Sequence, residues 1–457
     1  MSYCLECLKK QQEIDRLREE NTRLKARLRY QERTAKEGFF GSSTPSAKLP
    51  VKANTTLRET PGPRGGAQPG HQGHGRRSVP AEEADEVILV SSAETCPECG
   101  GALQDQGCRE RTIIEVEPLR RKTIHCQLEQ KYCPRCRRKV RPRAPGVFKK
   151  SLFGNRLLAH VAVQHYVFGV TLGQLEIQLG VGNGSLHGAM HQLAARLAPA
   201  CDRLLEDYCQ APVKHADETS WRTDGFNGYA WLFCSQQTSL FRFRQTRSGQ
   251  IVEEVFGQER LSGVLVVDRY AAYNAAPCPL QYCYSHLLRE VQDLEKEFPE
   301  EIEVQLFTSI LAPLLAAAMQ LRAQGLDSAA FSAQARQLKE RIVDWTENVA
   351  NHPGVQRIQN IFRENPTRLY HWAEDPQIPA ENNFAERTLR PLVIARKISF
   401  GSQSPKGALT REVLMSVLHT LRKRGGDTTA LFAQALDKLA AQDALSPYDA
   451  LFKIDSS

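Results

Sequence analysis

The chain has 457 residues, of which 41% are hydrophobic, and a formal net charge of +8. This length is too great for one ordinary domain, so we expect three or four units in a multidomain α+β protein. No apolar run approaches the roughly 20 residues of a membrane span, and the first residues are charged instead of resembling a signal peptide. We therefore expect a cytoplasmic protein with no membrane partner.

Residues 1–36 are predicted to form a short coiled-coil helix. Its alternating a and d heptad positions are occupied by Ile14, Leu17, Asn21, Leu24 and Leu28. An Asn at an a position favours a parallel dimer in register, so we expect a homo-oligomer. About two heptads are marginal for a stable pair, so other contacts are expected to assist it.

Residues 37–82 read as a basic linker rich in Gly and Pro, and residues 83–150 as a zinc ribbon that binds DNA. Two Cys-Pro-x-Cys pairs supply the predicted zinc ligands, which are Cys96, Cys99, Cys133 and Cys136. Four thiolates in two such pairs complete a tetrahedral structural Zn²⁺ site. Cys108 and Cys126 are alternative ligands, and a ribbon without metal is the other interpretation.

Positive charge is concentrated on and after this ribbon. Residues 107–150 carry 14 Lys or Arg against 4 Asp or Glu. The predicted DNA-binding residues of this segment are Arg137, Arg138, Lys139, Arg141 and Arg143. Such a cluster is typical of a protein that binds the phosphate backbone, although a solvated basic face would have the same composition.

Residues 151–210 are predicted to be helical and to contain a helix-turn-helix. A helix over about residues 171–179 is followed by a glycine-bearing turn at 180–182 and a second helix that begins near Gly184. Ser185 and His187, near the start of this second helix, are expected to face the major groove of DNA.

Three acidic residues in residues 211–425 carry the predicted chemistry. Asp217 and Asp268 each close a short apolar run with strand character, and Glu386 lies among good helix formers next to arginines. A two-metal phosphoryl-transfer site holds ions about 3.5–4 Å apart with hard oxygen ligands. These residues therefore predict a catalytic site with two Mg²⁺ (or Mn²⁺) ions. Most single acidic residues are solvated surface, which is the competing interpretation.

The pattern around the acids predicts the order of elements in this core. Aromatic and β-branched runs after Asp217 predict a hairpin, and residues 248–259 predict a crossover helix before the strand that ends at Asp268. Leucine-rich segments over about residues 286–351 predict a helical insertion before the helix of Glu386. Residues 426–457 are expected to form a C-terminal helical tail.

Long strings of this chain resemble the transposases of the IS66 family of bacterial insertion sequences. The similar strings include GGAQPGHQGHGRR, the CPECG and CPRC pairs, HADETSW and ENNFAERTLRPLVIARKISFGS. The resemblance implies an RNase H-like core of the DDE type, with Asp217, Asp268 and Glu386 as its three acids. The position of Glu381 is more often Asp in that family, so Glu381 and Glu386 are both candidates for the third acid. Glu386 is preferred.

The resemblance also implies the partners and the neighbours of the site. The partners are the terminal inverted repeats of an element, target DNA in the bacterial nucleoid, and possible accessory proteins encoded by the same element. His286 is a possible neighbour of the metals, or else a packed residue that caps a helix. The residues expected to hold DNA beside the acids are Arg387, Arg390, Arg396 and Lys397.

The predicted activity is metal-dependent cleavage at the element ends, followed by attack of the freed 3′-OH on target DNA. Tyr270 and Tyr273 are weak candidates for a recombinase nucleophile. Two other functions remain open, namely a DNA-binding regulator with an inactive core and a structure-specific nuclease.

Overall fold

The computed structural model describes residues 10, 13–25, 28, 81–83, 87, 99, 121–135, 137–140 and 142–453. Contacts between residues group Met1–Leu49 with Thr123–Ser457, and separate Pro50–Lys122 as a second unit. In the second unit, the described part includes the short 3₁₀ helix η2 (Ala81–Glu83). Most of the predicted linker and of the first half of the ribbon, including Cys96 and Cys108, lies outside the described residues.

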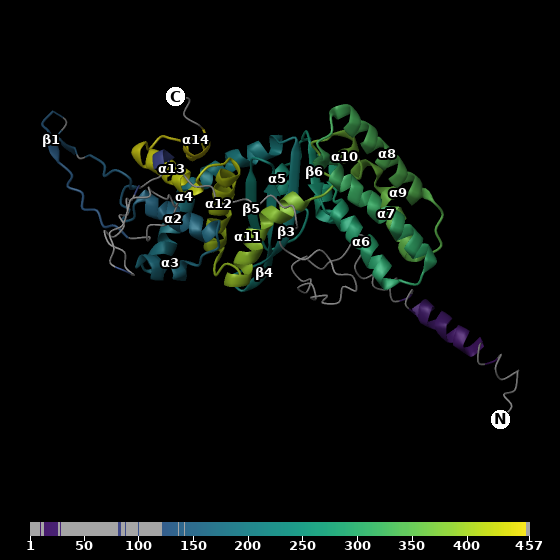
Figure 1. Ribbon diagram of the computed structural model, residues 1–457. Helices are drawn as coiled ribbons and strands as arrows, with labels where there is room; N and C mark the ends of the chain where they lie inside the picture. The colour runs from purple at the N-terminus through teal and green to yellow at the C-terminus, as the bar shows by residue number, and fades with distance from the viewer. Residues whose placement is uncertain are drawn as a thin grey trace. The chain divides into compact units, whose positions relative to one another are not determined.

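Residues 13–25 form a helix, as predicted for this part of the chain (Figure 1). Its apolar stripe is exposed, since Leu17 and Leu24 retain 52% and 55% of their accessible surface. An exposed stripe of this kind is compatible with the predicted pairing of two copies, which stays a prediction.

A short hairpin follows in the ribbon segment. Strand β1 (Lys131–Cys133) pairs antiparallel with β2 (Arg138–Val140), and Cys133 lies opposite Arg138. Cys133, the first cysteine of the second Cys-Pro-x-Cys pair, is therefore the last residue of β1. Cys136 lies outside the described residues, and the zinc site stays a prediction.

Three helices occupy the predicted helix-turn-helix segment, namely α2 (Asn155–Tyr166), α3 (Leu172–Leu179) and α4 (Asn183–Gln210). Thr171 begins α3 with a capping box, and Gly180 ends it in the left-handed conformation at φ 60°. The helices and turn thus lie where the sequence predicts them. Helix α4 has 28 residues and continues to Gln210, the end of the predicted helical segment.

A five-stranded mixed sheet follows in the chain. Its strands are β3 (Val213–Thr223), β4 (Phe226–Cys234), β5 (Ser239–Arg244), β6 (Val264–Val267) and β7 (Leu280–Tyr282). Their order in the sheet is β5-β4-β3-β6-β7. Strands β3, β4 and β5 pair antiparallel, as predicted for the hairpin, whereas β6 and β7 extend the sheet in parallel from β3.

The sheet is buried on both faces. Along β4, Leu232 belongs to one hydrophobic core and the adjacent Trp231 and Phe233 belong to the other. Side chains of a strand alternate between faces, so this sequence of apolar residues builds both cores at once. Helix α5 (Gln250–Phe256), the predicted crossover helix, packs into the second core.

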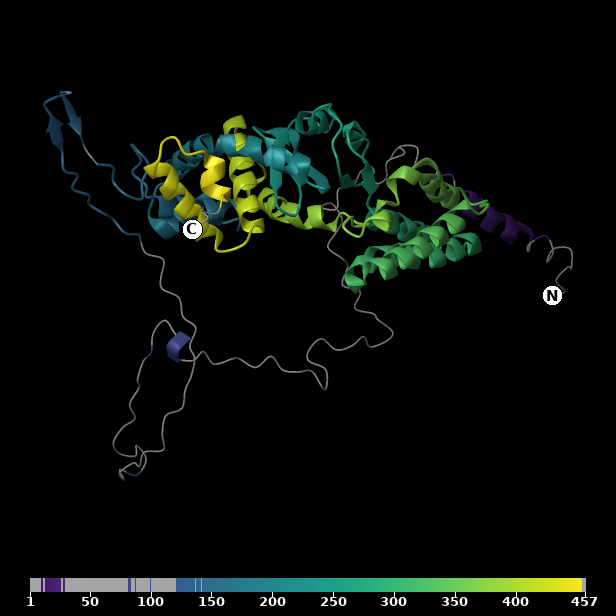
Figure 2. The same ribbon diagram turned by 90° about the horizontal axis from the view of Figure 1, so that it is seen from above.

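Helices separate β7 from the helix of Glu386, as predicted (Figure 2). They are α6 (Tyr284–Glu297), α7 (Ile302–Leu321), α8 (Ser328–Glu347), α9 (Pro353–Glu364) and α10 (His371–Glu374), with the 3₁₀ helices η3 (Ala271–Ala275), η4 (Arg322–Gln324) and η5 (Pro366–Arg368) nearby in the chain. Helix α7 packs against α6 and α8, and α8 against α9. The helical region therefore continues beyond the predicted end at residue 351.

The segment Ile302–Gln324 is long and apolar enough to cross a membrane by length and composition, contrary to our expectation for the chain. Helix α7 contains Pro313 and buries Leu311, Leu314 and Leu315 in the second core. This packing is typical of a core helix in a helical layer.

The last helices of the described chain are α11 (Asn383–Ser399), α12 (Pro405–Lys423), α13 (Thr428–Ala441) and α14 (Pro447–Phe452). Helix α13 packs against α2, and α14 against α4. Residues predicted as a C-terminal tail therefore share the first core with the helices before the sheet.

Candidate active site

Helix α11 lies along one face of β3, and alternate residues of the strand contact the helix or the loop that follows it. His215 Nδ1 lies 2.9 Å from Asn382 Oδ1, at the start of the helix. Near its end, Arg396 Nη1 donates to Thr219 Oγ1 at 2.7 Å. Residues two apart on a strand share a face, so Asp217, between these two contacts, also belongs to the face toward α11.

The structure corrects the predicted setting of Asp217. We expected it to close its strand, but β3 continues for six further residues to Thr223. The continuation pairs with β4 in register, with Asp217 opposite Leu232 and Thr223 opposite Phe226. The long hairpin extends the strand because the polar residues after Asp217 alternate with buried ones such as Trp221.

Asp268 lies where the sequence predicts it, directly after the buried strand β6. Its Oδ1 accepts a hydrogen bond from the backbone N–H of Tyr270 at 2.9 Å, which fixes the turn after the strand. Strand β6 runs parallel to β3, with Val266 opposite His215. Asp268 therefore lies level with Asp217 on the neighbouring strand.

Glu386 lies in the first turn of α11, on a helix as predicted. Glu381 precedes the helix, because Asn382 is its N-cap residue. Glu381 therefore lies outside the helix that carries Glu386. Burial raises the pKa of Glu381, and the charges that act on it are those of Arg322 and Arg387.

The three candidate acids interact electrostatically. Burial raises the pKa of Asp217 well above its ordinary value, and the carboxylates of Glu218, Asp268 and Glu386 raise it further. Glu381 is absent from this set of charges. The carboxylates thus form one acidic cluster in which each added negative charge makes the next less favourable.

The donor chemistry of this cluster fits a hard divalent cation, since carboxylate oxygens are the ligands that Mg²⁺ prefers. Within the described part of the chain, however, no three His, Cys, Asp or Glu side chains converge closely enough to hold one ion.

Glu218 is a buried acid that the sequence analysis missed. Its side chain retains 3% exposure, accepts a hydrogen bond from Arg247 Nε at 2.9 Å and accepts another from the hydroxyl of Tyr273. It lies on the face of β3 opposite to Asp217. The Arg247 guanidinium also stacks on the ring of Tyr270 at 3.9 Å.

The same contacts argue against a tyrosine nucleophile. The hydroxyl of Tyr273 donates to Glu218, and that of Tyr270 donates to the carbonyl of Arg247. Tyr273 is fully buried. Both tyrosines therefore pack and orient the turn after Asp268.

His286 lies in the first turn of α6, half-buried beside the acids. Burial lowers its pKa, but Cys283, Asp268 and Glu386 outweigh burial and raise the value to about 10. Its Nδ1 is buried without a hydrogen-bond partner among the described residues. His286 is thus a neighbour of the acidic cluster, and its place beside bound metals stays a prediction.

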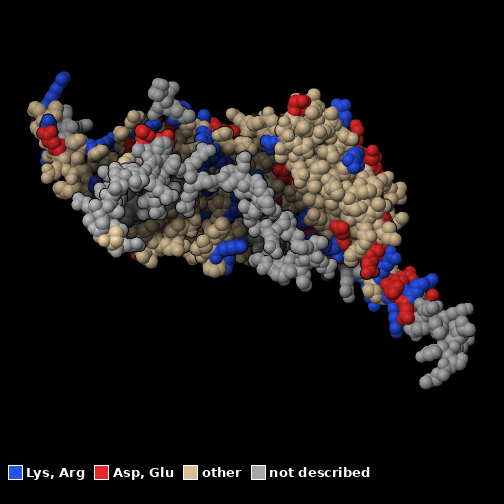
Figure 3. All heavy atoms as spheres, viewed as in Figure 1, with Lys and Arg blue, Asp and Glu red and all other residues tan. Residues whose placement is uncertain are grey.

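The basic residues of α11 divide into two groups. Arg396 is half-buried and donates to Ser220 O at 2.8 Å, which fixes the helix to β3. Arg387, Arg390 and Lys397 are exposed. Figure 3 shows Lys and Arg side chains around α11 on this face. Exposed cations beside an acidic cluster are suited to hold a nucleic-acid strand near it.

The other predicted DNA-binding residues are spread along the chain. Ser185 and His187 are exposed in the first turns of α4, and Arg137 and Lys139 are exposed at the β1–β2 hairpin. The side chains of Arg138 and Arg141 lie outside the described residues. Arg143 binds Asp443 at 2.5 Å and the carbonyl of Ala440 at 3.0 Å, so it joins the ribbon segment to the end of α13.

A sequence profile of the IS66 transposase family matches residues 150–410, which contain the sheet, the acidic cluster and the helices between them. The chain belongs to the IS66 transposase family. This membership indicates a transposase or nuclease activity in general terms.

Related sequences from Sinorhizobium fredii cover most of the chain. The uncharacterized protein y4jD is 24% identical over 78% of this chain and 76% of its own length. The uncharacterized protein y4hP is 20% identical over 82% of this chain and 76% of its own length. A third, y4jO, is 37% identical over a short segment of 75 residues.

Proposed function

We propose that this chain is a DNA transposase that binds the ends of its insertion sequence, cuts them, and joins the 3′-OH ends to target DNA. The observation that carries the proposal is that Asp217 lies between the two contacts of β3 with the helix of Glu386 and level with Asp268 on the neighbouring strand, where the charges of Asp268 and Glu386 act on it. These three residues come from distant segments and from the elements that a DDE site requires, two strands and a helix.

The sheet topology supports an RNase H-like core. An antiparallel meander of three strands, extended from its first strand by two parallel strands, gives the order β5-β4-β3-β6-β7. Asp217 lies on β3, the first of these strands in the chain, and Asp268 follows β6, the fourth in the chain. Glu386 lies on the helix that packs along the first strand.

In the proposed reaction, Asp217, Asp268 and Glu386 would hold two Mg²⁺ or Mn²⁺ ions, which would supply activation of the attacking hydroxyl and stabilisation of charge on the phosphate. Water first attacks the phosphorus at an element end, so that its oxygen bonds to phosphorus as the P–O3′ bond breaks, which leaves a 3′-OH and a 5′-phosphate. That hydroxyl then attacks a target phosphodiester in line, so that one P–O bond forms as another breaks. Arg387, Arg390 and Lys397 neutralise the strand that crosses the cluster.

The remaining segments are proposed to supply affinity for DNA. The residues Cys96, Cys99, Cys133 and Cys136 would hold the structural Zn²⁺ ion. The exposed cations of the hairpin would bind phosphates, and Ser185 and His187 would meet base edges. The helix at residues 13–25 would join two copies of the chain.

The experiment is a cleavage and joining assay with the full chain, Mg²⁺, and duplex DNA carrying the inverted repeats that flank its gene. We expect wild-type protein to cut and join, and Asp217→Ala and Asp268→Ala to bind the DNA without doing either. Glu340→Ala, at an exposed acid of α8, is the matched control. Cutting without joining would instead identify a nuclease, and binding without cutting a regulator.

A further inference from the structure

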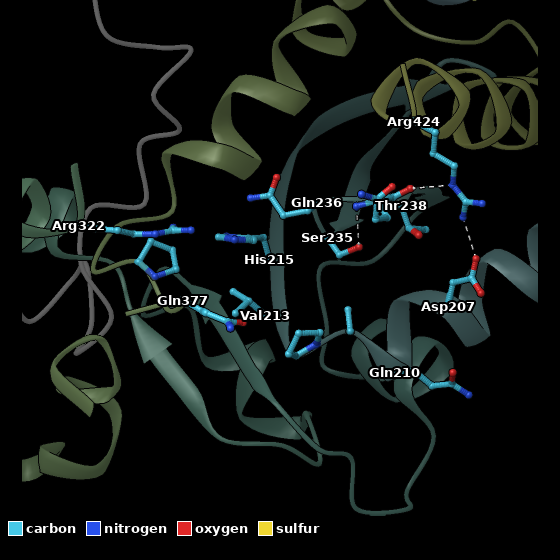
Figure 4. Close-up of a pocket in the computed structure, with 14 residues that line it drawn as sticks. Asp207, Gln210, Val213, His215, Ser235, Gln236, Thr238, Arg322, Gln377 and Arg424 are labelled. Atoms are coloured by element: carbon cyan, nitrogen blue, oxygen red, sulfur yellow. Dashed lines mark hydrogen bonds and ion pairs between the residues drawn. The ribbon is translucent and has the colours of Figure 1, made fainter. Parts of the chain in front are cut away.

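A cavity of about 580 Å³ lies at the beginning of β3, the strand that carries Asp217 (Figure 4). Its walls come from the end of α4, the β4–β5 turn, η4 and the segment before α11, and include Val213, His215, Gln236, Arg322 and Gln377. Small-ligand sites commonly measure about 300–1,000 Å³. The cavity therefore has room for one small molecule or one nucleotide.

His215 presents a fixed hydrogen-bond acceptor at this cavity. Asn382 Nδ2 donates to the carbonyl of Ala216 at 2.8 Å, which turns Asn382 Oδ1 toward His215 Nδ1. Nδ1 must then carry the proton, so Nε2 of the neutral ring is an acceptor. The residue is 2% exposed, and Nε2 makes no hydrogen bond within the described residues. A ligand with an N–H donor would satisfy it.

Arg322 supplies positive charge from the other side. Figure 4 shows its side chain extending toward His215 and Gln377. Arg322 is exposed and forms no hydrogen bond or ion pair with another described residue, whereas Arg424, the other arginine of the cavity, is bound to Asp207 at 2.9 Å. Arg322 influences the Glu381 carboxylate electrostatically but donates no hydrogen bond to it, so its N–H groups are available to a ligand anion.

The other walls suit a flat ring. Val213 and Pro212 are apolar, Pro379 is buried, and the amides of Gln236 and Gln377 can each donate and accept. His215 and Asp217 lie on the same face of β3, roughly 7 Å apart along the strand. A DNA strand whose phosphate lies at Asp217 would bring its neighbouring nucleotide to this cavity.

We propose that this cavity binds a single unpaired nucleotide of the DNA strand, with its base on His215 and the glutamine amides and its phosphate on Arg322. The proposal rests on the proposed function, because it places the nucleotide beside the reacting phosphate. Enzymes that act on DNA can take a base out of the stack and bind it in a pocket of this kind.

The proposed nucleotide site can be tested by isothermal titration calorimetry of the full chain with 2′-deoxyadenosine 5′-monophosphate. The titration is done in EDTA so that no metal contributes to binding. We expect Arg322→Gln to weaken binding at least about tenfold, since it removes a charge-assisted hydrogen bond. Gln377→Ala, in an exposed turn, should also weaken binding. Arg336→Gln, an exposed arginine of α8 outside the cavity, should leave it unchanged. Deoxyadenosine and inorganic phosphate should each bind more weakly than the nucleotide.

Equal losses in Arg322→Gln and Arg336→Gln would overturn the proposal, because the nucleotide would then bind elsewhere. Inorganic phosphate that binds as tightly as the nucleotide would overturn it in favour of a simple anion site. The titration is independent of the cleavage assay. Asp217→Ala should still bind the nucleotide, so a protein that binds it but never cuts DNA would contradict the proposed function alone.

Discussion

His215 Nδ1 lies 2.9 Å from Asn382 Oδ1, and this contact joins the first acid-bearing strand to the start of the helix that carries Glu386. The backbone N–H of Asn382 also donates to Cys283 Sγ at 3.1 Å, next to α6. The buried residue Asn382 thus connects β3 through its side chain and α6 through its backbone N–H to the start of α11. The spacing of the candidate acids depends on these bonds.

Asn382→Ala should therefore impair both stability and activity. It leaves His215 Nδ1 and the carbonyl of Ala216 unpaired in a buried site, which should cost roughly 3 kcal/mol of unfolding free energy in a denaturant titration. A displaced Glu386 should lower the cleavage rate by about a hundredfold. Asn383→Ala is the control, since that side chain makes a single long contact of 3.3 Å with Ser285. Unchanged cleavage in Asn382→Ala would show that Asn382 does not position Glu386.

The third acid can be assigned by comparing Glu386→Ala with Glu381→Ala. Glu386 acts electrostatically on Asp217, whereas Glu381 interacts with Arg322 and Arg387. We expect the first variant to lose cleavage and joining and the second to keep both. An active Glu386→Ala beside an inactive Glu381→Ala would reverse the assignment.

The stability of the metal-free protein should depend on pH through Asp217. Its pKa is raised in the folded state, so its contribution to stability is complete below the unfolded value of about 4 and is lost as pH rises through the folded value. Asp217→Asn removes this loss. Its Tm in EDTA should exceed that of the wild type by a margin that grows from pH 4 to pH 8.

Addition of Mg²⁺ provides the matching measurement. A divalent cation that binds the cluster should raise the Tm of the wild type by mass action, and raise that of Asp217→Asn much less. A Tm of Asp217→Asn that falls below the wild type at pH 8 in EDTA would contradict the electrostatic interpretation.

The ion pair between Arg247 and Glu218, on the face of β3 opposite to Asp217, should contribute to the stability of the fold. Arg247→Ala leaves Glu218 as a buried charge without its cation, which should cost roughly 3–5 kcal/mol in denaturant unfolding. The double variant Arg247→Ala with Glu218→Gln should recover much of this loss, because no unpaired charge remains. Equal stability of the single and double variants would show that the pair contributes little.

The zinc prediction concerns the ribbon. Cys99→Ser or Cys136→Ser should release about one equivalent of Zn²⁺, measured by atomic absorption, because a structural site needs all four thiolates. DNA affinity should fall while the folded sheet persists in circular dichroism. A metal-free variant with both substitutions and full DNA affinity would rule out a structural role for zinc in binding.

Local patterns in the sequence were sufficient to predict most elements of the core. The run Val264–Val267 predicted a buried strand that ends at Asp268, since four apolar residues bounded by polar ones can be buried on both faces of a sheet. The hairpin, the crossover helix and the helix of Glu386 follow from periods of two and of 3.6 residues. These features depend on neighbours in the chain.

The tertiary structure decided which face each side chain occupies. Asp217 and Glu218 are adjacent acids, and only the register of β3 against β4 places the first toward α11 and the second toward Tyr273. Glu381 lies outside the helix because Asn382 bonds to His215 and Ala216 and becomes the N-cap. Such outcomes depend on contacts between residues far apart in the chain, up to the 167 positions between His215 and Asn382, which no local period encodes.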